Sequence, residues 1–252
     1  MTATVKQILN CIGVDTSVPI SVLRNGFGFI RARVPTDPDT TVTAQVSLLQ
    51  QLRECQGESI NINVIRVGYD ALPAATADDD LEKLDYAVYK CRNIFRQVSV
   101  GVARVQHWFI DQADANGRDD IGSADEQEAL ADEWTVPNDG IDAFVVRTIS
   151  ATFIGRSPID GACDKDDKDD GLLGGDSTRG YDGLARTFAH EIGHYLTLEH
   201  NHGGRPACPN TTAGQNNLMA QTRCAVTVRG STLLTNGQGS DMRGHCMSRV
   251  RC

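Results

Sequence analysis

The sequence lacks any run of about 18 apolar residues, the length needed to cross a bilayer as a helix. Its first residues, MTATVKQILNCIGVDTSVPI, also lack the continuous apolar stretch of a signal peptide. Basic residues are in deficit, with 24 Lys plus Arg against 33 Asp plus Glu and a formal charge of -9. So acidic a chain has no electrostatic footprint for phosphate backbones or anionic lipid, and we expect neither nucleic-acid binding nor membrane insertion.

No Cys-x-x-Cys pair occurs among the eight cysteines, which argues against a zinc ribbon or finger. Three cysteines, Cys224, Cys246 and Cys252, crowd into the last 30 residues, where little apolar sequence is available. This crowding indicates disulfide bonds formed in an oxidising compartment, so the sequence favours a secreted, extracellular protein.

The chain is long enough to form one hydrophobic core. With 252 residues, 40% of them hydrophobic and 23% charged, it matches an ordinary globular domain with a small appendage. We expect an N-terminal appendage over residues 1–26, an N-terminal subdomain over residues 27–200 and a C-terminal subdomain over residues 201–252.

Hydrophobic periodicity predicts an α+β arrangement. Strands are expected at residues 28–34, 60–67, 102–110 and 143–154, and helices at residues 42–52, 81–98 and 183–198. Asp78, Asp79 and Asp80 would sit at the positive end of the second helix dipole. The polar stretch at residues 111–139 is typical of a long surface loop, a second acidic stretch covers residues 160–176, and an irregular, disulfide-held lobe should follow Gly203.

Residues 190–194 read His-Glu-Ile-Gly-His, which composition predicts to occur by chance only about 0.005 times. On a helix, His190 and His194 lie about 40° apart and one turn along, so both imidazoles can reach one metal ion. Glu191 flanks the pair, where it can take a proton from a metal-bound water. A separate apolar stripe would bury the helix and leave the histidines facing a cleft; it consists of Leu184, Phe188, Ile192 and Leu196.

Zinc in a catalytic site needs a third protein ligand and leaves a fourth position for water. The last glutamate of the chain is Glu199, so a glutamate from a distant downstream helix is excluded. His200 completes His-Glu-Ile-Gly-His-Tyr-Leu-Thr-Leu-Glu-His, which resembles the long signature of the metzincin family, H-E-x-x-H-x-x-G-x-x-H. The resemblance makes His190, His194 and His200 the expected zinc ligands.

Thr197 stands where the metzincin signature has glycine. The chain must bend between His194 and His200, because an unbroken helix would put His200 about 80° away from His190. A β-branched residue in the left-handed region costs on the order of 1–2 kcal/mol, several times less than zinc ligation is worth.

Other third ligands stay open. The bend could lie at Asn201 or at Gly203-Gly204, which would make His202 the ligand. Asp241 would resemble the aspartate-liganded zincins, and His245 is a further candidate.

Metzincins carry a methionine in a tight turn beneath the metal, and Met219, which follows Asn216-Asn217, is well placed for it. The flanking Cys208 and Cys224 make the region look most like the pappalysin-like branch. Residues 81–110 are similar to the backing helix and sheet of the family, and residues 143–154 sit where the family has its substrate-binding edge strand. The resemblance thus implies a zincin/metzincin-like α+β fold, with a mixed twisted sheet, a backing helix and an active-site helix.

The function implied is that of a zinc-dependent endopeptidase acting, as a monomer, on protein or peptide substrates. Zinc would lower the pKa of its bound water and polarise the scissile carbonyl, while Glu191 takes the proton and later gives it to the leaving amine. Substrate would lie extended along the edge strand.

Two other functions stay open: a non-catalytic secreted binding module or toxin component on a zincin fold, favoured by Thr197, and a hydrolase of small amides. The run from Cys163 to Asp170 could supply oxygen ligands for Ca²⁺, but we favour the alternative of a solvated acidic loop beside the cleft.

Overall fold

The computed structural model describes residues 57–165, 171–202, 208–227 and 229–250. The N-terminal appendage, the strand at residues 28–34 and the helix at residues 42–52 lie outside the described residues, as do Cys11, Cys55 and Cys252.

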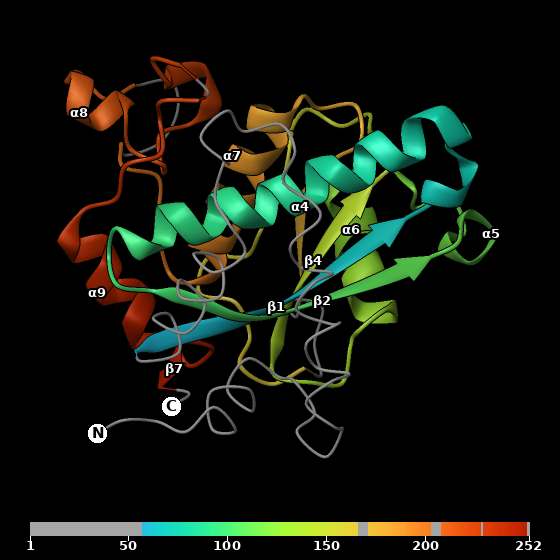
Figure 1. The fold of residues 1–252 in the computed structure, drawn as a ribbon, viewed down its shortest axis with the longest axis horizontal. Coiled ribbons are helices and arrows are strands. Elements are labelled where there is room, and N and C mark those ends of the chain that lie inside the picture. Colours follow the sequence, from blue (N-terminus) through green and yellow to red (C-terminus); the bar gives the residue numbers. More distant parts are fainter. Residues whose placement is uncertain (1–56, 166–170, 203–207, 228, 251–252) are drawn as a thin grey trace, which may run out of the picture.

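The described elements alternate between strands and helices in the first two thirds of the chain and become short and irregular in the last third (Figure 1). In chain order they are β1 (Glu58–Val67), η1 (Tyr69–Ala71), α4 (Ala74–Arg96), β2 (Gly101–Ile110), α5 (Gln112–Ala115), β3 (Asp120–Ile121), α6 (Ala124–Glu133), β4 (Gly140–Val146), β5 (Thr148–Ile149), β6 (Gly171–Asp176), α7 (Tyr181–Tyr195), α8 (Thr212–Gln215), η2 (Thr222–Cys224), α9 (Asn236–Gly244) and β7 (Arg249–Val250).

One mixed sheet forms the centre of the molecule. Its strands follow the order β2-β1-β4-β6 and pair in parallel, while β7 adds an antiparallel contact at the start of β1. Parallel strands need both faces covered, and β1 is accordingly rich in Ile and Val and is buried over nearly its whole length. The strands expected at residues 60–67 and 102–110 are therefore confirmed as β1 and β2.

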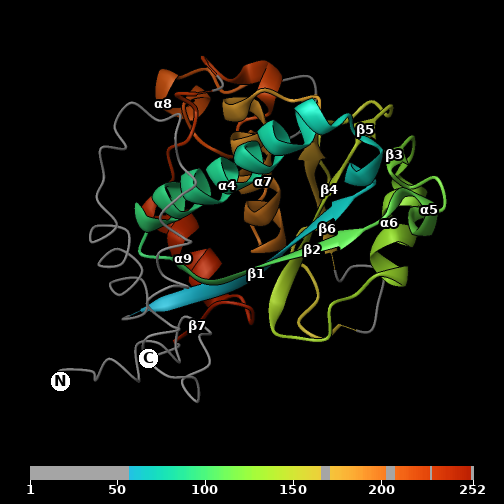
Figure 2. The same cartoon turned by 45° about the vertical axis from the view of Figure 1, so that its right-hand side comes forward.

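Helices cover the two faces of the sheet unequally (Figure 2). On one face, α4 and α7 pack against each other and against β1 side chains such as Ile60 and Ile62. On the other face, α6 covers β1 residues such as Ile65 and Val67. Alternate residues of one strand thus belong to two different hydrophobic clusters, as the two-residue period of a strand requires. The α+β fold class expected from the sequence is confirmed.

Two expectations about these elements are wrong. Helix α4 begins at Ala74, so Asp78–Asp80 lie in its second turn instead of at the positive end of its dipole. Residues 111–139 are not one long loop, because they contain α5, β3 and α6; the α6 start is marked by Ser123, whose hydroxyl accepts from the Glu126 amide. The acidic stretch at residues 160–176, for which the sequence predicts no element, ends in strand β6.

Residues 143–154 do not form an edge strand. Their first part belongs to β4, which lies between β1 and β6 in the interior of the sheet, and β6 takes the edge position. Residues 152–157 follow as an irregular segment that touches β6 through one antiparallel bridge between Arg156 and Leu173. The order of strands is a tertiary property, and the periodicity of one segment does not reveal it.

Disulfides hold the C-terminal region, as expected. Cys163 pairs with Cys246 and Cys208 with Cys224. The first bond ties the end of α9 to the segment before β6, and β7 then returns to pair with β1. None of the described helices combines the length and the apolar character that crossing a lipid bilayer takes.

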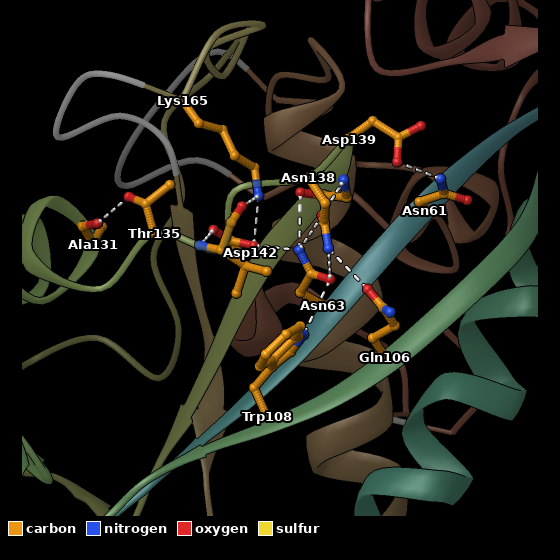
Figure 3. Close-up of polar contacts among 12 residues, drawn as sticks. Asn61, Asn63, Gln106, Trp108, Ala131, Thr135, Asn138, Asp139, Asp142 and Lys165 are labelled. Atoms are coloured by element: carbon orange, nitrogen blue, oxygen red, sulfur yellow. Dashed lines mark hydrogen bonds and ion pairs between the residues drawn. The ribbon is translucent and has the colours of Figure 1, made fainter. Parts of the chain in front are cut away.

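A buried polar network links β1 and β2 to the beginning of β4 (Figure 3). Asn63 on β1 donates to the carboxylate of Asp142 on β4 at 2.6 Å and accepts from the Trp108 indole of β2 at 3.3 Å. Asp142 is 1% exposed and also accepts from Lys165 at 2.7 Å and from the Val136 amide at 2.9 Å. Burial raises the pKa of Asp142, and Lys165 opposes that shift.

The substitution Lys165→Met leaves the Asp142 carboxylate buried without its cation. We expect the free energy of unfolding to fall by about 3 kcal/mol near pH 8. The loss should be much smaller near pH 4, because removal of Lys165 raises the pKa of Asp142 further and the carboxyl then becomes protonated instead of staying charged. Urea unfolding at both pH values measures the two losses, with Lys165→Arg as the charge-preserving control. Equal losses at the two pH values would contradict this account.

Candidate active site

Helix α7 carries the His-Glu-Ile-Gly-His motif. It begins after Gly180, has Asp182 in its first turn and buries Leu184, Phe188 and Ile192 in the core shared with α4 and the sheet. The opposite side of the helix therefore turns His190 and His194 away from that core.

Three imidazoles converge at the end of this helix. The Nε2 atom of His194 lies 3.1 Å from that of His190 and 3.3 Å from that of His200, and the Nε2 atoms of His190 and His200 are 3.3 Å apart. These ligand atoms form one cluster that could hold a metal ion. Nitrogens bound tetrahedrally to one zinc ion at about 2.0–2.1 Å lie about 3.3–3.4 Å apart, so the donor set fits zinc.

The protonation of two of these rings is fixed by backbone carbonyls. Nδ1 of His190 lies 2.8 Å from the carbonyl oxygen of Leu218, and Nδ1 of His194 lies 2.6 Å from that of Leu198. A carbonyl only accepts, so each Nδ1 carries the proton and each Nε2 of the neutral ring presents its lone pair. Burial lowers the pKa of both histidines, which keeps the rings neutral.

The chain bends at Thr197, which adopts a φ of 78°. The Leu198 amide donates to the Gly193 carbonyl at 2.9 Å and the Thr197 amide to the His194 carbonyl at 3.0 Å. This pair of bonds is the Schellman motif, in which the left-handed position is usually glycine. The bend turns the Leu198 carbonyl towards His194 and brings His200 back to the other two rings.

The alternative third ligands lie elsewhere. His202 stacks on His200, with ring centroids 5.8 Å apart, and is not part of the three-nitrogen cluster. Asp241 is exposed on α9. His245 donates to the Gly161 carbonyl at 3.0 Å and lies beside the Cys163–Cys246 disulfide, whose sulfurs are not available to a metal.

Met219 lies in a tight turn next to α7. The Ala220 amide donates to the Asn217 carbonyl at 3.1 Å, and the Asn217 side chain accepts from the Met219 amide at 2.9 Å. The Met219 side chain is fully buried, and a Cβ atom placed on Gly193 would come within 2.9 Å of its Sδ. The glycine of the motif thus makes room for the methionine.

Arg186, one turn before His190, joins α7 to this turn. It is 2% exposed, and its guanidinium donates to the carbonyls of Leu218 at 3.0 Å, of Ser231 at 3.0 Å and of Ala220, and to the hydroxyl of Thr222 at 3.0 Å. Burial lowers its pKa to about 10, an effect that the charge of Glu191 opposes. The Leu218 carbonyl therefore accepts from both Arg186 and His190.

Glu191 is buried and lines a cavity of about 380 Å³. Burial raises the pKa of its carboxyl to about 8, and the charges of Arg186 and Arg156 oppose that shift. The backbone of Gly155 lies against it, because a Cβ there would come within 2.9 Å of Oε1. A carboxyl with a pKa near neutrality, beside a cluster that can hold zinc, can both take and give a proton.

The cavity lies between two segments of the chain. Its lining comes from residues 152–157, from α7 with His190, Glu191 and His194, from His200, and from Gln221, Thr222 and Arg223. The end of the segment expected to bind substrate thus reaches the cavity, although it is not a strand.

Three residues of this site carry no role predicted from the sequence: Arg186, Gly193 and Gly155. The sequence does contain a signal for Gly193: a glycine inside a helix costs about 1 kcal/mol, which indicates that another part of the structure requires the absence of a side chain there. Arg186 and Gly155 act through contacts with residues distant in sequence.

No family model matches this chain, and no curated protein sequence matches it. Among solved structures, it is similar to metalloproteinase-II from Bacteroides fragilis (11% identity, TM-score 0.46, covering 93% of this chain and 59% of that one). Archaemetzincin from Methanopyrus kandleri is also similar, with 13% identity and a TM-score of 0.42; the match covers 73% of this chain and 94% of that one. A third match is the structure of a chaperone-substrate complex (12%, 0.45), of which the chain spans 35%.

The parts of the fold expected from the sequence are present: a mixed sheet, the backing helix α4, the helix α7 with His190 and His194, and a disulfide-held C-terminal region. The calcium site considered as an alternative at residues 163–170 has no support. Cys163 forms a disulfide and Lys165 binds Asp142, while residues 166–170 lie outside the described part.

The substitution Thr197→Gly should raise the free energy of unfolding by about 1 kcal/mol, since glycine adopts a positive φ without strain. It also removes a buried hydroxyl that has no hydrogen-bond partner among the described residues. Denaturant unfolding of the metal-free protein measures the gain. Thr197→Ala, which keeps the Cβ atom, is the control and should gain less. A loss of stability in the glycine variant would mean that the left-handed bend is not strained.

The substitution Arg186→Met removes a donor from three carbonyls: those of Ala220 and Ser231 lose the Arg186 hydrogen bond, and that of Leu218 keeps only the one from His190. We expect a loss of about 3 kcal/mol in the free energy of unfolding and about tenfold weaker zinc binding, since Leu218 then holds His190 less firmly. Urea unfolding and competition with a chromophoric chelator measure the two effects. Arg229→Met, at an exposed arginine, is the control. Unchanged zinc affinity would show that Arg186 does not help to orient His190.

Proposed function

We propose that this chain is a zinc-dependent endopeptidase. The observation that supports it best is the convergence of three imidazole Nε2 atoms, 3.1–3.3 Å apart, beside the buried carboxyl of Glu191 in one cavity. A purely structural zinc site has no need of such a carboxyl, whereas a catalytic site leaves one position open for the reacting water.

In this proposal His190, His194 and His200 hold the metal. Bound zinc supplies two effects, a lower pKa of water and polarisation of the scissile carbonyl. Glu191 takes the proton of the attacking water and delivers it to the leaving amine. Gly155 keeps space for that carboxyl, and Met219 packs beneath the site against Gly193.

The substrate is an extended segment of a protein or peptide. It would run along residues 152–157, where main-chain hydrogen bonds could hold it in the cavity beside the three histidines. We also propose a boundary near residue 200 between an N-terminal and a C-terminal subdomain, and it is supported by a cavity lining that comes from both sides of that residue. We propose a monomer that resembles the pappalysin-like branch.

The two disulfides of the described part support a secreted protein, because such bonds persist in oxidising compartments. The alternative of a non-catalytic binding module rested on Thr197. Since Thr197 adopts the bend and His200 still lies with the other two histidines, this residue no longer favours that alternative.

Elemental analysis of the purified protein should give one equivalent of zinc, and casein digestion should be lost when a chelator removes it. Glu191→Gln should retain the zinc and lower the rate of digestion by about 10²–10⁴-fold, the usual contribution of a general base. Glu199→Gln changes an exposed carboxylate near the site and should keep full activity. Zinc binding without digestion by the unmodified protein, or digestion that survives in Glu191→Gln, would overturn the proposal.

A further inference from the structure

The cavity is unusually cationic for so acidic a chain. Its lining includes three arginines, Arg156, Arg186 and Arg223, but only one acidic residue, Glu191. The formal charge of the whole chain is -9. Positive charge is thus concentrated at the place where a substrate would lie.

Two of these arginines differ in how their charge is balanced. Arg156 forms an ion pair with Glu128 at 2.7 Å, so it adds little net charge. Arg186 touches no carboxylate in the part of the chain that the structure describes; all four of its hydrogen bonds go to neutral oxygens. The residue is 2% exposed. Its charge interacts electrostatically with one carboxylate, that of Glu191, without a direct contact.

The Arg186 guanidinium also has donor capacity left. It has five N–H groups, and four donate to Leu218, Ala220, Ser231 and Thr222. The fifth is on Nη1, the atom bonded to the Thr222 hydroxyl, which itself lines the cavity. A buried cation with an unused donor at a cavity wall attracts an anionic group more strongly than a solvated one does.

Arg223 extends this charge to the rim. It follows Thr222 in η2, is exposed, and its Nε donates to the Gln221 side chain at 2.9 Å. The next residue, Cys224, is held by the disulfide to Cys208. The disulfide therefore holds the backbone beside Arg223 in place. A residue that selects substrate side chains needs such a fixed position.

We propose that the cavity selects peptides with an Asp or Glu side chain next to the scissile bond, and that Arg223 contacts this carboxylate while Arg186 supplies a fixed charge behind it. This proposal rests on the proposed function. A carboxylate forms charge-assisted, two-point hydrogen bonds with a guanidinium, whereas a Lys or Arg side chain would be repelled.

The test uses the zinc-loaded protein and peptides that differ only by Glu, Gln or Lys at each position beside the cleaved bond. We expect kcat/KM to be about tenfold higher for Glu than for its isostere Gln at one position, and the ratio to fall as salt is added. In Arg223→Glu the preference should shift to Lys, and in Arg223→Gln it should shrink. Arg229→Glu makes the same change of net charge outside the cavity and should keep the original ratio.

Binding gives a readout that does not depend on turnover. Calorimetry with the metal-free protein should show tighter binding of the Glu peptide than of the Gln peptide, and Arg223→Gln should abolish the difference. If no peptide and no casein is cleaved and yet the Glu peptide is preferred, the proposed function fails and the anion site stands. Cleavage or binding without a preference for Glu overturns the present inference and leaves the peptidase proposal intact. If the preference for Glu is unchanged in both Arg223 variants, Arg223 does not contact the substrate carboxylate and that part of the inference is wrong.

Discussion

The carbonyl oxygen of Leu218 is the acceptor on which the site depends. It takes a hydrogen bond from His190 at 2.8 Å and another from Arg186 at 3.0 Å, one turn earlier on the same helix. Through this one atom the helix orients His190, one of the proposed zinc ligands, and fixes the turn that carries Met219. A ligand held in one tautomer before metal arrives needs no reorganisation when the metal binds, which is why such outer hydrogen bonds are worth 10–100-fold in metal affinity.

The bend at Thr197 serves the same purpose for the rest of the cluster. It ends α7, returns His200 to the two helical histidines and directs the Leu198 carbonyl to Nδ1 of His194. A β-branched residue in the left-handed region stores strain of about 1–2 kcal/mol. The strain is tolerated because the Schellman hydrogen bonds, and the packing of Leu198 in the core, fix the backbone independently of the side chain at residue 197.

The sequence could predict those parts of the site that are local. His190, His194 and His200 fall within eleven residues, so helical geometry and one necessary bend bring them together. The helices near residues 81–98 and 183–198 could be predicted because each has an apolar stripe. Strand β6 escaped prediction, since Gly-Leu-Leu-Gly-Gly-Asp contains no β-branched residue, and so did the interior position of β4, which depends on strand order. The role of Arg186 could not be predicted, because its hydrogen-bond acceptors are backbone oxygens and a hydroxyl 32 to 45 residues away. Such contacts produce no recognisable sequence pattern.

The central claim is that the three histidines, and no sulfur or carboxylate, hold one zinc ion. X-ray absorption at the zinc edge of the purified protein tests it most directly. The account predicts three imidazole nitrogens and one further light atom at about 2.0–2.1 Å, with one imidazole lost in His200→Ala. Sulfur in the first coordination shell, or a spectrum that His200→Ala leaves unchanged, would contradict it.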